Sequence, residues 1–260
     1  MASALIGGLI ARGAKPSSIS VVELAPAARR KLSARFKVHA SAAADARTNS
    51  ADTLVLAVKP QDLRAAVTTF AGSPSGKLVI SIAAGIRLAD LSRWLGGYGK
   101  LIRCMPNTPA LIGAGVSGLY ALPEVSAAER RRAERILGAV GKIVWVKDES
   151  LLDPVTAVSG SGPAYVLWFI EQLAAAGESL GLPREDSRIL ALETVLGAAK
   201  LAAGSKEPPA VLRERVTSKG GTTAAALRVF DEEKLAERFR RAIEAASRRG
   251  AEMGEEFGKN

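Results

Sequence analysis

The chain has 260 residues, of which 48% are hydrophobic, so it can bury the core of one large domain or two ordinary ones, and its apolar runs are far shorter than the roughly 20 residues of a membrane span. The net charge of +10 could indicate a nucleic-acid partner, but the basic residues interleave with acidic ones in helical stretches and aromatic residues make up only 5%, so we interpret the charge as a solvated surface. One cysteine, Cys104, and one histidine, His39, exclude an internal disulfide and a Cys/His zinc cluster, and they give no support to a metal site or to serine–histidine catalysis.

Short β-rich runs alternate with helical stretches over residues 1–148. The expected strands cover residues 20–23, 53–58, 77–82, 100–103 and 143–146. The expected helices between them include residues 60–70, 88–95 and 126–140. Three of the strands are mostly apolar without strict alternation, which is typical of strands covered by helices on both faces. This order predicts an α/β domain with a doubly wound parallel sheet at residues 1–148.

The beginning of the chain has a helical pattern where a dinucleotide-binding domain would have a strand. Such a Rossmann unit starts with a strand, continues into a G-x-G-x-x-G loop that holds the phosphates, and then enters a helix. Residues 1–10 look like the helix itself, and Gly7 and Gly8 lie within its pattern. We therefore expect a Rossmann-like sheet whose first strand is missing, and we do not assign these two glycines to a phosphate loop.

Long helices replace the alternating pattern from residue 149 onward. The segment from Ser159 to Pro163 offers cap residues and a proline suited to the first turn of a helix that reaches residue 181. Further helices are expected over residues 184–203, after Pro209, and over residues 231–254. The sequence therefore predicts a second, all-helical domain at residues 149–260.

Ligands of an open parallel sheet bind beyond the carboxyl ends of its strands. In this chain those ends are residues 57–60, 82–85 and 105–109, with Glu23 closing the first expected strand. Small residues at positions 83–85 would let a flat cofactor lie against the backbone, and the nearby prolines turn the chain away from the sheet. Tight turns without a ligand are the alternative at each single place, and the coincidence of several strand ends favours a ligand.

The residue at the end of the first expected strand bears on the choice of cofactor. A glutamate such as Glu23 typically binds the adenosine ribose hydroxyls and favours NAD. An arginine there would favour the 2′-phosphate of NADP, and Arg29 and Arg30 follow only a turn or so later. NADP and NAD therefore both stay open.

A glycine turn in the helical half is a second candidate site. Gly220 and Gly221 precede Thr222 and Thr223 at the start of a short helix. Free backbone N–H groups and hydroxyls in this arrangement can bind a carboxylate. The alternative is a glycine turn and helix cap with no ligand.

Five stretches of the sequence resemble the motifs of pyrroline-5-carboxylate reductases. They are LAVKPQ at residues 56–61, SIAAGI at 81–86, IRCMPNTPA at 102–110, VSGSGPAYV at 158–166 and VTSKGGTTAAAL at 216–227. Each is weak alone, but they occur in the family's order and approximate spacing and span essentially all of the chain. The resemblance is therefore highly specific.

The resemblance implies a Rossmann domain followed by a helical dimerisation domain, with the active site where the sheet edge meets the partner subunit's helices. It implies an NADPH- or NADH-dependent reduction of 1-pyrroline-5-carboxylate to L-proline, the last step of proline biosynthesis. It also implies a homodimer or decamer of dimers. From the composition and charge we expect a cytoplasmic protein with no nucleic-acid or membrane partner and no metal. The residues it places beside the cofactor are Val58, Lys59, Pro60, Ile82, Ala83, Ala84 and Asn107.

For the substrate, the resemblance implies binding by Thr222 and Thr223, with Glu149 lining the same pocket. We expect the backbone N–H groups of Gly221, Thr222 and Thr223 to bind the carboxylate, and the Thr223 hydroxyl to donate to the imine nitrogen. Such a reaction needs mainly the alignment of two bound molecules, so no histidine is required.

Two departures from the family pattern stand out. Lys219 occupies a position where the family usually has proline, which could loosen the substrate loop or add a cation near the carboxylate. Met1 corresponds to the residue just after the family's glycine-rich loop. We therefore expect the natural start to lie upstream, and neighbours of the absent strand to lack backbone partners.

Two other functions are compatible with parts of the pattern. A non-catalytic dinucleotide-binding dimer would keep the fold, but it would have no need of the 218–223 loop. A β-hydroxyacid or other imine reductase would have a catalytic lysine early in the second domain. Glu171 and Gln172 stand there instead, and Lys200 comes only later.

Overall fold

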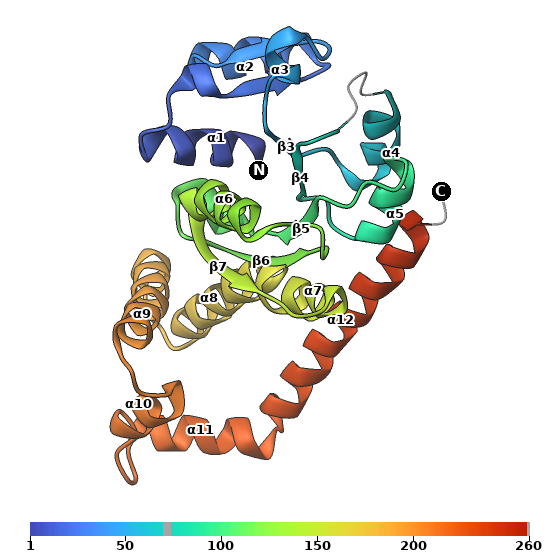
Figure 1. The fold of residues 1–260 in the computed structure, drawn as a ribbon. Helices are drawn as coiled ribbons and strands as arrows, with labels where there is room; N and C mark the ends of the chain where they lie inside the picture. Colours follow the sequence, from blue (N-terminus) through green and yellow to red (C-terminus); the bar gives the residue numbers. More distant parts are fainter. Residues whose placement is uncertain (70–73, 259–260) are drawn as a thin grey trace. The chain divides into compact units, whose positions relative to one another are not determined.

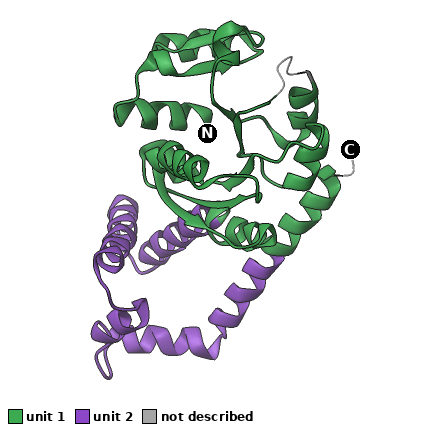
Figure 2. Cartoon of the chain, viewed as in Figure 1, with its two compact units in different colours: residues 1–161, 246–260 green, residues 162–245 purple. Residues whose placement is uncertain are grey.

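The computed structural model describes residues 1–69 and 74–258 (Figure 1). The chain divides into two compact units (Figure 2): residues 1–161 with 246–260, and residues 162–245. The domain boundary expected after Asp148 stays a prediction, because it concerns folding domains, whereas the compact units separate after Ser161.

The first unit contains two sheets within the described residues. A two-stranded parallel sheet consists of β1 (Ser20–Val22) and β2 (His39–Ser41). A five-stranded sheet has the order β3-β4-β5-β6-β7, with bounds Thr53–Leu56, Leu78–Ser81, Leu101–Met105, Gly115–Ala121 and Gly141–Trp145. Its strands pair in parallel except for β6, which runs antiparallel to β5.

All five expected strands are present, and β2 and β6 were not anticipated from the sequence. β6 contains Gly115, Ser117 and Gly118, which are not typical strand residues. Packing explains its two glycines: a Cβ on Gly118 would lie 2.6 Å from Cγ1 of Val155, and one on Gly115 would lie 2.9 Å from the backbone of Ala110. Close approach of neighbouring segments therefore requires glycine at these two positions. The sheet is mixed, because β6 runs antiparallel to β5.

The two sheets are not joined by strand pairing in the described part of the chain. β1 pairs with β2 alone, and β3 pairs with β4 alone. In a doubly wound sheet with strand order 3-2-1-4-5-6, the first strand lies between the second and the fourth strand and pairs with both. Three of the four β3 residues are only partly buried, whereas all four β4 residues are buried. β3 is therefore an edge strand with apolar side chains.

Helices cover the five-stranded sheet on both faces (Figure 1). One apolar cluster joins Leu78, Ile80 and Ile102 of the sheet to Leu5 of α1 and Leu137 of α6. A second cluster joins Val79 and Leu101 to side chains of α4 and α5. The α-helices of this unit are α1 (Ala2–Ala11), α2 (Pro26–Phe36), α3 (Ala46–Asn49), α4 (Pro60–Thr69), α5 (Leu88–Trp94), α6 (Ala127–Leu137) and α7 (Leu152–Val155).

Short helical turns connect these elements: η1 (Pro16–Ser18), η2 (Thr108–Ile112), η3 (Gly138–Val140), η4 (Glu149–Leu151) and the π-helical η5 (Thr156–Gly160). The helices expected at residues 88–95 and 126–140 are confirmed as α5 and as α6 followed by η3. The last residue of the helix expected at 60–70 lies outside the described residues.

The second unit is helical, as expected. It contains α8 (Gly162–Ser179), α9 (Arg184–Gly204), α10 (Pro209–Arg215), α11 (Thr222–Glu232) and the first part of α12 (Leu235–Gly258). The last helix, expected from residue 231 to about residue 254, is present as α12 but begins only at Leu235, because α11 continues to Glu232 and Lys234 then adopts a φ of 52°. It ends at Gly258. None of the described helices has the length and apolar character that a membrane crossing requires.

Candidate active site

The carboxyl ends of β3, β4 and β5 lie along one edge of the five-stranded sheet. These strands are adjacent and parallel, with Leu56 opposite Ser81 and Ser81 opposite Arg103. The chain leaves each strand directly into a segment singled out by the sequence. The structure therefore brings the following residues to one edge: Val58, Lys59, Pro60, Ile82, Ala83, Ala84 and Asn107.

The turn after β4 presents mainly backbone at this edge. The Ile82 N–H donates to the carbonyl of Leu56 at 3.1 Å, and Gly85 has a φ of 75°. Ala83 is 3% exposed, whereas Ala84 is half-buried. Side chains this small add little bulk beyond the backbone of the turn.

Asn107 has a structural role that its position after β5 did not reveal. Its Nδ2 donates to the carbonyl of Ser159 at 3.2 Å, and its Oδ1 accepts from the Val116 N–H at 3.0 Å. The side chain is buried. It ties the end of β5 to η5 and β6, and its amide is therefore already engaged.

Glu23 lies apart from this edge, just after β1 in the two-stranded sheet. Its Oε1 accepts from the Ala25 N–H at 2.9 Å. Its carbonyl accepts from Nη1 of Arg29 at 2.7 Å. Glu23, which favours NAD, and Arg29, which favours NADP, thus lie side by side. Their positions do not decide between the two cofactors.

Glu149 belongs to a buried ionic cluster. Its Oε1 lies 3.1 Å from Nη1 of Arg103 and accepts from the Leu88 N–H at 2.8 Å. Asp153 completes the cluster, with Oδ1 3.7 Å from Nη2 of Arg103 and Oδ2 2.6 Å from Nη2 of Arg87. Burial lowers the pKa of Arg103, and Glu149 opposes that effect.

This cluster was missed by the sequence reasoning, although a signal was present. Arg103 lies in the middle of the apolar strand Leu101–Met105 and is 3% exposed. A cation in such a strand requires charged partners, because burying an unpaired charge costs several kcal/mol. The cluster joins η4 and α7 to β5 and to the start of α5.

In the helical unit, Gly221 caps α11. Gly220 has a φ of 74°, and the Gly221 N–H donates to the carbonyl of Ser218 at 3.0 Å. No side chain caps this helix, so the N–H groups of Thr222 and Thr223 lack partners within it. Thr223 is half-buried, and Thr222 and Lys219 are exposed. The geometry is that of a small anion site at a helix N-terminus.

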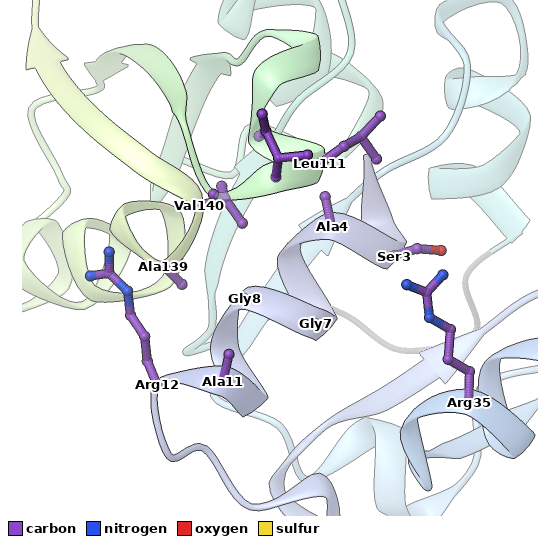
Figure 3. Close-up of a pocket in the computed structure, with 13 residues that line it drawn as sticks. Ser3, Ala4, Gly7, Gly8, Ala11, Arg12, Arg35, Leu111, Ala139 and Val140 are labelled. Atoms are coloured by element: carbon purple, nitrogen blue, oxygen red, sulfur yellow. The ribbon is translucent and has the colours of Figure 1, made fainter. Parts of the chain in front are cut away.

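A separate pocket of about 470 Å³ runs along α1 (Figure 3). Its walls are α1, η2, η3 and the side chain of Arg35, and none of the predicted site residues lines it. Gly7 and Gly8 are helical, as expected. A Cβ on Gly8 would lie 2.6 Å from Cγ1 of Val140, so this glycine permits close packing of α1.

Comparison with known proteins is consistent with this arrangement. The family described as pyrroline-5-carboxylate reductase dimerisation matches residues 149–253, and the family described as NADP oxidoreductase, coenzyme F420-dependent, matches residues 1–85. The chain is 44% identical to a pyrroline-5-carboxylate reductase of Pseudomonas aeruginosa, over 100% of this chain and 95% of that protein. The chain belongs to the pyrroline-5-carboxylate reductase family.

Other pyrroline-5-carboxylate reductases show the same similarity. One from Synechocystis is 41% identical, over 98% of this chain and 95% of that protein. A solved pyrroline-5-carboxylate reductase of Coxiella burnetii is 37% identical and has a TM-score of 0.92, covering 97% of this chain and 94% of its own. The Plasmodium falciparum pyrroline carboxylate reductase was solved with NADP bound, and it has 29% identity and a TM-score of 0.83 at the same coverage.

Proposed function

We propose that this chain reduces 1-pyrroline-5-carboxylate to L-proline with NADPH or NADH, the last step of proline biosynthesis. The similarity over the whole chain to pyrroline-5-carboxylate reductases is the observation that carries the proposal. The relatives give no support to the alternative of a non-catalytic dinucleotide-binding dimer.

The cofactor lies along the edge formed by the ends of β3, β4 and β5. Val58, Lys59 and Pro60 flank it on one side, and Ile82, Ala83 and Ala84 form the floor under its nicotinamide. When bound, the reduced nicotinamide supplies the hydride for the imine carbon. Glu23 and Arg29 contact the adenosine ribose, and their balance sets the preference between the two cofactors.

Asn107 and Glu149 support the site through the residues that they hold. The Asn107 amide fixes the segment after β5, whose backbone borders the nicotinamide. Glu149 fixes the first N–H of α5, directly after the turn that follows β4. This part of the proposed cofactor site stays rigid, because the Asn107 and Glu149 side chains are both held by hydrogen bonds within the protein.

The substrate is held by the turn before α11. The free backbone N–H groups of Thr222 and Thr223 bind its carboxylate, and the partial positive charge of the helix N-terminus favours that anion. The Gly221 N–H, expected from the sequence to take part, already donates to the Ser218 carbonyl at 3.0 Å. The Thr223 hydroxyl donates to the imine nitrogen, and it has no hydrogen-bond partner of its own among the described residues. Lys219, two residues before Gly221, adds a cation that attracts the carboxylate.

A second copy of the chain covers apolar side chains that are exposed on the helical unit. Val166, Leu167, Trp168 and Phe169 of α8 are each at least 48% exposed. So large an apolar stretch is typical of a subunit interface. The homodimer is cytoplasmic, and its assembly into a decamer of dimers stays a prediction.

The direct test follows absorbance in the nicotinamide band with 1-pyrroline-5-carboxylate and each cofactor in turn. We expect oxidation that depends on both the enzyme and the imine, with proline as the product. A folded dimer that leaves both cofactors reduced would contradict the proposed reaction.

A further inference from the structure

The turn between β4 and α5 is held from outside by the last turns of α12. Figure 1 shows the end of α12 beside α5. The ring of Phe257 packs at Gly85, where an added Cβ would lie 3.0 Å from Cδ2 of Phe257 and 3.4 Å from Cβ of Met253. Gly85 itself is buried and has a φ of 75°. The backbone of this turn therefore has α12 directly behind it.

Glycines lie on the face of α12 that makes this contact. Gly250, Gly254 and Gly258 are spaced four residues apart and therefore share one face of the helix. A Cβ on Gly254 would lie 2.9 Å from Nε of Arg87, one on Gly250 would lie 3.7 Å from Cβ of Asp153, and Gly258 lies against Asp90. Glycine inside a helix costs about 1 kcal/mol relative to alanine. The close contacts explain Gly254 and Gly258, whereas an alanine at position 250 would make only an ordinary contact with Asp153.

Polar contacts fasten the same segment. The Gly258 carbonyl accepts from Nη2 of Arg93 at 2.9 Å. Arg87, which packs at Gly254, is paired with Asp153 at 2.6 Å. Phe257 also packs against the apolar cluster that contains Ala83, Ile86 and Leu88. The end of α12 thus packs at Gly85 and against the apolar cluster that contains Ala83, a residue that we place beside the cofactor.

We infer that Phe257 is a positioning residue for the nicotinamide cofactor: its ring holds the backbone of Ala83 and Ala84 in the conformation that receives the cofactor. The inference rests on the proposed placement of the cofactor at the β4 turn. Within the turn itself, the Ala83 N–H donates to Ser81 Oγ at 3.4 Å, a long contact that restrains the backbone little. Without the ring, the Gly85 region can move toward the space that it leaves.

The test is steady-state kinetics of Phe257→Ala, with NADPH and 1-pyrroline-5-carboxylate varied separately. We expect the KM for NADPH to rise about tenfold, which corresponds to a loss of about 1.4 kcal/mol, while the KM for the imine stays within about twofold. Phe257→Leu keeps an apolar contact and should recover most of the affinity. Gly254→Ala places a Cβ 2.9 Å from Nε of Arg87, so it should push α12 away from the turn and raise the same KM.

Trp94→Ala is the matched control. Trp94 packs in the same apolar cluster but lies at the far end of α5 from the turn. It should lower the melting temperature and leave the KM for NADPH unchanged. If Phe257→Ala and Gly254→Ala leave that KM unchanged, or if Trp94→Ala changes it equally, the inference is wrong.

A further variant separates this inference from the proposed cofactor site. Ala84→Asp places a carboxylate on the half-buried residue of the turn and should raise the KM for NADPH strongly. If Ala84→Asp has this effect and the Phe257 and Gly254 variants do not, only the positioning role fails. If Ala84→Asp also has no effect, the cofactor does not lie at this edge.

Discussion

Oε1 of Glu149 joins the guanidinium of Arg103, 3.1 Å away, to the first N–H group of α5, which it accepts at 2.8 Å. One carboxylate oxygen therefore links the centre of β5 to the helix that follows the β4 turn. The same carboxylate therefore neutralises a buried charge in the sheet and fixes the chain that follows the β4 turn.

Removing the buried cation should destabilise the first unit. Arg103→Met leaves Glu149 without its buried cation, whereas Asp153 keeps its pair with Arg87. Removing one partner of a buried pair costs about 3–5 kcal/mol. Urea unfolding of the purified variant measures the loss. Arg188→Met breaks the exposed pair with Glu185, 2.6 Å long, and serves as the control because exposed pairs contribute about 1 kcal/mol or less. Equal stabilities of the two variants would contradict the role assigned to the cluster.

Stability in acid should depend on Glu129. Burial acts to raise the pKa of this carboxyl, but hydrogen bonds from Ser126 and Lys100 outweigh it and hold the pKa at about 2. A pKa lowered on folding means that the ionised form stabilises the fold. This contribution is complete above the ordinary value of 4.5 and disappears as the pH falls toward about 2.

Glu129→Gln tests this assignment. The free energy of unfolding of the wild type should fall more steeply than that of the variant between pH 4.5 and about 2, as measured by urea titration. Parallel curves for the two proteins would show that Glu129 does not carry the effect.

The strands that form the site could be predicted because their side chains are decided by burial. Residues 53–56 and 78–81 are apolar runs followed by turn residues, so the sequence predicts both the strands and the points at which the chain leaves the sheet. β2 and β6 could not be predicted in this way, because their small and polar residues are required by contacts with neighbouring segments. Gly118, which makes room for Val155, is an example.

The supports of the site could not be predicted because their partners are distant in sequence. Glu149 and Arg103 are 46 residues apart, and Arg87 and Asp153 are 66 apart. A single sequence indicates that Arg103 needs a partner, but only the fold identifies it. The contact between Phe257 and Gly85 had no signal in the sequence pattern at all.

The apolar surface of α8 should control dimer formation. Trp168 is 59% exposed in the single chain, and Trp168→Glu places a charge where we expect the second copy to pack. Analytical ultracentrifugation should show the dimer dissociating at concentrations at which the wild type is intact, because truncating or replacing a central aromatic commonly costs 2 kcal/mol or more. Glu185→Ala, on the exposed part of α9, is the control and should remain dimeric. A fully dimeric Trp168→Glu variant would place the interface elsewhere.

The most direct test of the proposed reaction is the steady-state turnover of Thr223→Ala beside Thr223→Ser, with saturating NADPH and 1-pyrroline-5-carboxylate. Removing the hydroxyl should lower kcat by about two to three orders of magnitude, the usual cost of losing one positioned catalytic hydrogen bond, and serine should restore most of it. Unchanged kcat and KM in Thr223→Ala would remove this residue from the mechanism and contradict the placement of the imine at the start of α11.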